Sequence, residues 1–130
     1  MPSDKGPKAE ERWARVLGNL SDVRDRLAEC AAIAARGRRA FFGDDFVLRY
    51  AAHSALIQAG NAIKDLPPAF LHDHPEVEWS ALARMRDKIG HGPGDGIDFQ
   101  FVWATITRDV PQDAAAVAAI LRELGAAPGR

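Results

Sequence analysis

The sequence predicts an all-α fold, a bundle of four or five helices. Apolar residues recur at steps of three and four along most of the chain, which is typical of amphipathic helices. No run of β-branched residues alternates with polar residues for more than a few positions, so we expect no strand. A chain of 130 residues has room for one core. We therefore expect one domain from 9 to 125, with a disordered tail at 1–8 and a further tail at 126–130.

The first predicted helix carries an apolar stripe with the spacing of a heptad seam. Its members are Trp13, Val16, Leu20, Val23, Leu27, Cys30 and Ala34. Such a stripe can pack inside a bundle or against a second copy of itself, and the sequence does not choose between them. Gly37 is expected to end this helix, and Asp44 or Asp45 to cap the next one.

The second predicted helix, 46–65, is rich in alanine and is stopped by Pro67 and Pro68. Asp73 and Glu76 form a capping-box pattern that is expected to open a third helix, which Gly90 ends. The predicted core face of that helix is Val77, Leu82, Met85 and Ile89.

Two further helices are expected after a loop rich in glycine and proline, residues 90–96. Asp98 is placed to cap the fourth helix, and Pro111 is expected to break or kink it. The predicted apolar stripes are Phe99, Val102, Trp103 and Ile106 before this proline, and Ala114, Val117, Leu121 and Leu124 after it.

Composition limits the classes of function. The net charge is -1, so a nucleic acid would have to be met by a local basic patch. The candidates for that patch are Arg36, Arg38 and Arg39, and the group Arg84, Arg86 and Lys88. No apolar run approaches the ~20 residues of a membrane span, and the first dozen residues lack the apolar stretch of a signal peptide. We therefore expect a cytoplasmic protein that does not bind a membrane. The single Cys30 fits a buried filler in a reducing compartment.

The segment ARMRDKIGHG, residues 83–92, carries the candidate chemistry. Arg86 and His91 are five residues apart, which on an unbroken helix of about 3.6 residues per turn would separate them by about 140°. A helix that ends at Gly90 lets the chain turn His91 back toward Arg86. Asp87 precedes His91 by four residues and can share its face.

These three residue types suit RNA cleavage by the 2'-hydroxyl of the substrate itself. A guanidinium can hold a phosphate through two hydrogen bonds, an imidazole can transfer a proton near neutral pH, and a carboxylate can orient the imidazole. This scheme requires no metal and no cofactor. The same residue types also occur as surface ion-pair formers and helix caps, so the short Arg-x4-His pattern is not specific by itself.

Metal binding is the less favoured interpretation of the histidines. The candidates would be His53, His72, His74 and His91 together with Asp73. Their spacing fits no closed zinc pattern, and we expect surface or capping roles instead.

The span from about Phe41 to Pro111 resembles the HepT-like branch of the HEPN superfamily. The similarity lies in FFGDDFVLRYAA, in GNA at 60–62, in VEWSALARMRDKIGH at 77–91, in IDFQFVW at 97–103 and in DVP at 109–111. Trp79 before the arginine and Trp103 after the loop make this combination far more specific than the motif alone.

The resemblance implies a helical ribonuclease toxin of a HepT/MntA-type toxin-antitoxin pair. It implies that Arg86 and His91 are catalytic, that Asp87 stands at a position usually held by a polar asparagine, and that two chains form a homodimer with both motifs in a shared cleft. It also implies an RNA substrate, such as tRNA or mRNA, and a nucleotidyltransferase antitoxin as partner.

Three residues depart from the family pattern. Pro93 replaces a tyrosine that the antitoxin modifies, Asn61 replaces an acid in the second helix, and Asp87 adds a negative charge beside the site. The alternative prediction is therefore a weakened or inactive binding module that recognises a nucleotidyltransferase or a nucleotide.

Overall fold

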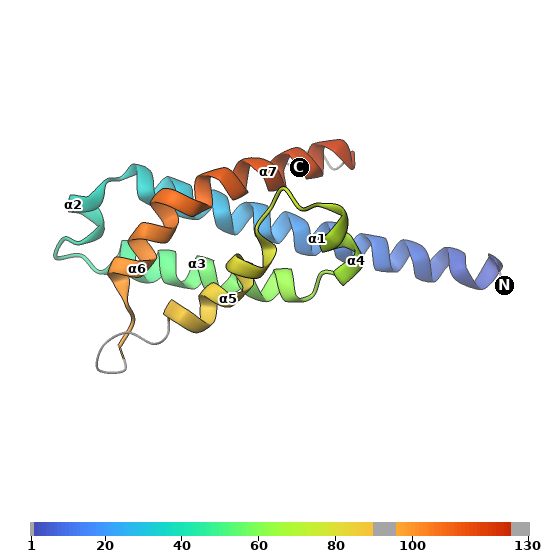
Figure 1. The fold of residues 1–130 in the computed structure, drawn as a ribbon, viewed down its shortest axis with the longest axis horizontal. Helices are drawn as coiled ribbons and strands as arrows, with labels where there is room; N and C mark the ends of the chain where they lie inside the picture. The colour runs from blue at the N-terminus through green and yellow to red at the C-terminus, as the bar shows by residue number, and fades with distance from the viewer. Residues whose placement is uncertain (1, 90–95, 126–130) are drawn as a thin grey trace.

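Helix α1 (Pro2–Ala35) is the longest element, and two of the other helices pack along it. The computed structural model describes residues 2–89 and 96–125, and within these ranges it contains helices and no strand. Helices α3 (Val47–Lys64) and α7 (Val110–Glu123) both pack against α1, and α5 (Trp79–Ile89) packs against α3. Figure 1 shows the N-terminal part of α1 projecting beyond the bundle. The predicted all-α class is confirmed.

The apolar stripe of α1 lies inside the chain's own core. Leu20, Val23, Leu27 and Cys30 are completely buried, whereas Trp13 at the projecting end is 43% exposed. The central part of the stripe therefore packs inside the bundle of its own chain and not against a second copy. The helix begins at Pro2, so helical backbone runs through most of the segment for which we expected a tail. The predicted domain boundaries stay predictions, and 126–130 lies outside the described residues.

The connection between α1 and α3 contains a short helix, α2 (Arg38–Phe41). Gly37 ends α1 as predicted, with a φ of 92° that suits glycine. Of the two candidate caps, Asp45 accepts a hydrogen bond from the backbone of Val47 at 3.0 Å. The Arg49 side chain of α3 holds this connection in place, because it donates to the carbonyl oxygens of Phe41 at 2.9 Å and of Gly43 at 2.8 Å.

The predicted capping box at Asp73 is wrong. Asp73 is the last residue of the short helix α4 (Pro68–Asp73), and α5 begins six residues later, at Trp79. The carboxylate that serves the start of α5 instead comes from α7. Asp113 is 5% exposed, and its Oδ1 accepts a hydrogen bond from the backbone N–H of Glu78 at 3.3 Å. A distant side chain therefore replaces the local cap.

The C-terminal half is one continuous helical run. It consists of α6 (Phe99–Ala104), the π-helical turn η2 (Thr105–Asp109) and α7. Asp98 caps α6 as predicted, accepting a hydrogen bond from the backbone of Phe101 at 3.0 Å.

Pro111 does not break this run. Its missing N–H leaves an earlier carbonyl without its usual partner, and a π turn accommodates such a local change of hydrogen bonding. The hydroxyls of Thr105 and Thr107 donate back to the carbonyl oxygens of Phe101 at 2.9 Å and Trp103 at 2.8 Å within the same turn.

The four long helical segments bury an apolar core. On α3, small residues such as Ala52, Ala55 and Ala59 are buried where the other helices approach closely. On the last run, Val102 and Ile106 before the proline and Val117 and Leu121 after it are completely buried, as predicted. None of the described helices is long and apolar enough to cross a membrane.

The buried Asp113 provides a test of the link between α5 and α7. Burial raises the pKa of its carboxyl, so the folded protein binds this proton more tightly than the unfolded chain does. The ionised group therefore opposes folding at neutral pH, and the penalty disappears as the pH falls toward its unfolded pKa of about 3.9. We expect Asp113→Asn, which keeps an oxygen for the Glu78 N–H, to have a higher Tm than the wild type at pH 7.5 and a smaller advantage at pH 4.5.

Thermal unfolding followed by circular dichroism measures this difference. Asp113→Ala is the matched control, because it removes the cap as well as the charge. Loss of a cap costs about 1 kcal/mol of the free energy of unfolding, so we expect a Tm below that of Asp113→Asn at both pH values. A lower Tm for Asp113→Asn than for the wild type at pH 7.5 would show that the ionised carboxylate stabilises the fold.

Candidate functional site

The candidate motif lies at the C-terminal end of α5. The described helix runs to Ile89, the residue before the predicted helix stop at Gly90. Arg86 belongs to α5 by its backbone, but its side chain lies outside the described part of the structure. His91 also lies outside the described residues, together with Gly92 and Pro93. The predicted approach of Arg86 and His91 therefore stays a prediction.

Asp87 is the one predicted site residue whose side chain is described. It is exposed on α5. Asn61, which stands where the family pattern has an acid, is exposed on α3, the helix against which α5 packs. Figure 1 shows α5 lying alongside α3, with the C-terminal end of α5 nearer the α6 end of the bundle.

Several contacts hold α5 in place and thereby position the backbone of the motif. Leu82 and Met85, two of its predicted core residues, are 3% and 6% exposed. Trp79 is 5% exposed, and its indole Nε1 donates to the carbonyl oxygen of His74 at 2.8 Å. Together with the Asp113 cap, these contacts anchor the N-terminal half of α5 on both sides. A helix fixed at its start presents Asp87 and the Arg86 backbone at defined positions on the surface.

The first predicted basic patch is partly engaged within the chain. Arg38 donates to the side chain of Gln100 at 3.3 Å, and its guanidinium lies 4.6 Å from the centre of the Phe42 ring. Arg36 and Arg39 are exposed beside it. In the second patch, Arg84 lines a shallow hollow with residues from α4 and the segment after it, namely Leu71, His72 and Val77. A structural role thus accounts for Arg38 in the first patch.

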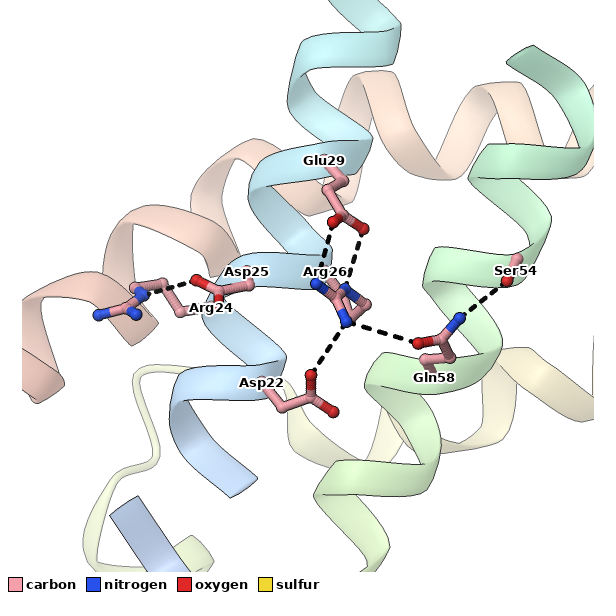
Figure 2. A network of polar contacts seen from close by, with 7 residues as sticks. All are labelled: Asp22, Arg24, Asp25, Arg26, Glu29, Ser54 and Gln58. Carbon is pink, nitrogen blue, oxygen red and sulfur yellow. Dashed lines mark hydrogen bonds and ion pairs between the residues drawn. The ribbon is translucent and has the colours of Figure 1, made fainter. Parts of the chain in front are cut away.

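A polar network joins α1 to the exposed side of α3 (Figure 2). The guanidinium of Arg26 pairs with Glu29 at 2.9 Å and with Asp22 at 3.1 Å along α1. It also reaches across to the side-chain oxygen of Gln58 at 3.5 Å, and Gln58 donates to the Ser54 hydroxyl at 2.9 Å. Because Arg26 is shared between two carboxylates, this cluster is not a free cation for binding phosphate.

The histidines do not gather in the described structure. His53 is partly buried in α3, and burial lowers the pKa of its imidazole, which favours the neutral form. The ring of His74 packs against Phe70 with 4.5 Å between centroids, and its Nδ1 lies 3.5 Å from Glu76. Within 2–89 and 96–125, no three histidine, cysteine or acidic side chains are placed to hold a metal ion.

The sequence of the chain matches that of a known protein family over most of the helical bundle. The family described as "Ribonuclease HepT-like" matches residues 23–120, about three quarters of the chain, including both α5 and the Arg-x4-His pattern. The chain belongs to this HepT-like family. The resemblance deduced from the sequence is therefore confirmed.

Related proteins of archaea and bacteria support the same assignment. A protein of Thermococcus cleftensis named "Probable ribonuclease HepT" is 33% identical over 94 residues, which cover 69% of this chain and 84% of the relative. A protein of Caldanaerobacter subterraneus named as a candidate RNase is 35% identical over 89 residues, which cover 66% of this chain and 79% of the relative. No solved structure is significantly similar to the chain.

Two features near the candidate site were not predicted. Asp113 occupies a core-facing position between Val110 and Val117, and a carboxylate in an apolar stripe was the available signal. The second feature is a group of exposed apolar residues where α3 begins. Phe46, Val47 and Tyr50 are more than half exposed. The Tyr50 ring contacts Phe46 and Phe99, with centroids 5.9 Å and 5.2 Å apart.

Cys30 is the only thiol in the chain, and its burial predicts that it is inert. It is completely buried, and desolvation raises its pKa to about 12. Since the thiolate is the reactive form, we expect no reaction of the folded protein with a disulfide reagent at pH 8 and one equivalent of reaction in denaturant. Absorbance of the released thiol measures both. Rapid labelling of the folded protein would mean that α1 separates readily from the core.

Proposed function

We propose that this protein is a metal-independent endoribonuclease in which Arg86 and His91 perform the chemistry and Asp87 assists. The observation that carries the proposal is the match to the HepT-like ribonuclease family over the segment that contains both residues. The position of Arg86 at the C-terminal end of α5, an anchored surface helix, is compatible with a role in substrate binding.

The proposed reaction is an internal transfer in RNA. The 2'-hydroxyl oxygen attacks the adjacent phosphorus, forming one phosphorus–oxygen bond, and the bond to the 5'-oxygen of the next nucleotide breaks. His91 either takes the proton of the attacking hydroxyl or gives a proton to the departing oxygen, and water supplies the other half of this proton exchange. Arg86 donates hydrogen bonds to the phosphoryl oxygens, whose negative charge increases in the transition state.

Asp87 has two opposing effects in this scheme. Its carboxylate can orient the His91 imidazole from a position four residues earlier. Its negative charge also competes with an RNA phosphate for Arg86, and the chain's net charge of -1 adds no general attraction for RNA. Because of the second effect, we expect the intrinsic activity to be lower than that of a relative with a neutral residue at this position.

The proposal includes two partners. A homodimer would place the two motifs in a shared cleft, and a nucleotidyltransferase antitoxin would neutralise the nuclease. The central part of the α1 stripe, one of the two dimer surfaces suggested by the sequence, is buried within the single chain. Dimerisation must therefore use another surface. Pro93 offers no hydroxyl for nucleotide transfer at the family's tyrosine position, so neutralisation here would rest on binding or on another residue.

RNA cleavage by the purified protein in EDTA tests the proposal. We expect cleavage of tRNA or mRNA without divalent metal, and a loss of at least about 100-fold for Arg86→Ala and for His91→Ala, since each removes a group acting on the transition state. Arg122→Ala is the matched control, because it removes an exposed cation from α7 and should leave the rate unchanged. Gel electrophoresis of end-labelled RNA gives the rates.

Two results would contradict the nuclease proposal. Cleavage that survives both substitutions would assign the activity to other residues or to a contaminant. Absence of cleavage by the folded wild-type protein, combined with binding to a nucleotidyltransferase or a nucleotide, would support the alternative of an inactive binding module.

A further inference from the structure

The exposed side of α3 carries no charged residue from Tyr50 up to its last residue, the exposed Lys64. The 14 residues from Tyr50 to Ile63 include no Asp, Glu, Lys or Arg, whereas the chain's 27% charged content corresponds to about four in a segment of this length. Along the solvent side lie Val47, Tyr50, Ala51, Ser54, Gln58 and Asn61, all exposed. Surface helices of soluble domains usually present charges there. We call these six residues the α3 face.

We infer that the α3 face is the surface through which two copies of this chain associate. The inference builds on the proposed function, which requires two chains, and it names the surface where they meet. Depletion of charge together with exposed aromatic residues is the compositional signature of the centre of a protein interface. Tyr50 is 52% exposed, and its ring is held between Phe46 and Phe99, so it is a pre-organised anchor.

The polar groups in the middle of the α3 face already have partners within the chain. Gln58 donates to Ser54 and receives the Arg26 guanidinium from α1, as Figure 2 shows. A polar group that already has a hydrogen-bond partner within its own chain loses less when another protein surface excludes water from it. The lowered pKa of His53, which lies in the same helix, favours its neutral form.

Charge favours a second copy over RNA. The α3 face presents no cation, whereas binding of RNA depends on cations that neutralise phosphates. Arg49 lies in the same helix, but it donates to the Phe41 and Gly43 carbonyls. Asp44 and Asp45, exposed at the start of α3, would repel a polyanion. In a two-fold dimer the same surface of each copy meets that of the other. When this surface is uncharged, the two copies do not repel each other.

The area required also indicates which neighbours take part. A helix of 18 residues is about 27 Å long and about 10 Å wide, which gives about 270 Å². A standard interface buries about 800 Å² per partner, so α3 must be joined by its flanks. Those flanks are α1 with the Arg26 network, which supplies a charged rim, and α5, both of which pack against α3. An interface centred on α3 thus includes or borders the helix that carries Arg86.

Sedimentation equilibrium of the full chain tests this surface without any assay of RNA cleavage. We expect a dimer at micromolar concentration for the wild type. Ala51→Glu, which places a charge in the α3 face, should weaken association at least about tenfold, and Tyr50→Ala should weaken it similarly. Ala115→Glu makes the same change at an exposed position of α7, away from the α3 face, and is the matched control, which should remain dimeric. Circular dichroism of each variant confirms that the fold is kept.

Each outcome decides the inference. Monomeric Ala51→Glu and dimeric Ala115→Glu support it, even if no variant cleaves RNA, in which case only the nuclease proposal fails. A wild-type monomer, or a dimer that Ala51→Glu and Tyr50→Ala leave intact, overturns it. Ultraviolet crosslinking of RNA to Tyr50 in a monomeric wild type would assign the α3 face to RNA instead.

Discussion

The fold depends on the burial of one stripe of α1 between α3 and α7. Leu20, Val23, Leu27 and Cys30 are completely removed from solvent, and both neighbouring helices are placed by their contacts with this stripe. Burying a side chain of the size of leucine or valine stabilises a fold by about 1.5–3 kcal/mol. Helix α5 packs mainly against α3 and also contacts α6, and the Trp79 hydrogen bond and the Asp113 cap hold its N-terminal end. The helix that carries the candidate chemistry therefore joins the core through α3 and through its own buried residues Trp79, Leu82 and Met85.

Sequence periodicity predicted the helices well because each one buries a single face. In the apolar stripes before and after Pro111, Val102, Ile106, Val117 and Leu121 are buried as expected, and the other four residues are partly buried. Asp98 and Gly37 act at the helix ends where local capping chemistry placed them. The error at Asp73 has a different origin. The start of α5 is capped by a residue 35 positions away, and no local pattern can indicate such a contact.

The residues of the candidate site were inferred from the sequence, and both their role and their geometry stay predictions. The residue types and their spacing indicated Arg86, Asp87 and His91, and family membership over 23–120 places the same segment in a ribonuclease family. The exposed aromatic residues at the start of α3 were not predicted, because Tyr50 and Phe46 look like core residues in a list of apolar positions. Only the packing of α3 against α1 and α5 determines which of its sides faces the solvent.

The π turn in front of Pro111 determines the direction in which the last helix faces. In an α-helix each residue adds about 100° of rotation, so a single extra residue changes the side of the helix on which every later side chain lies. The η2 turn accommodates the wider hydrogen-bonding pattern at 105–109, and beyond it Val117, Ile120 and Leu121 still point into the core. Removing one residue from η2 would turn these three side chains toward water. The length of this short turn therefore constrains the chain as strictly as the identity of its core residues, although most of its own side chains face the solvent.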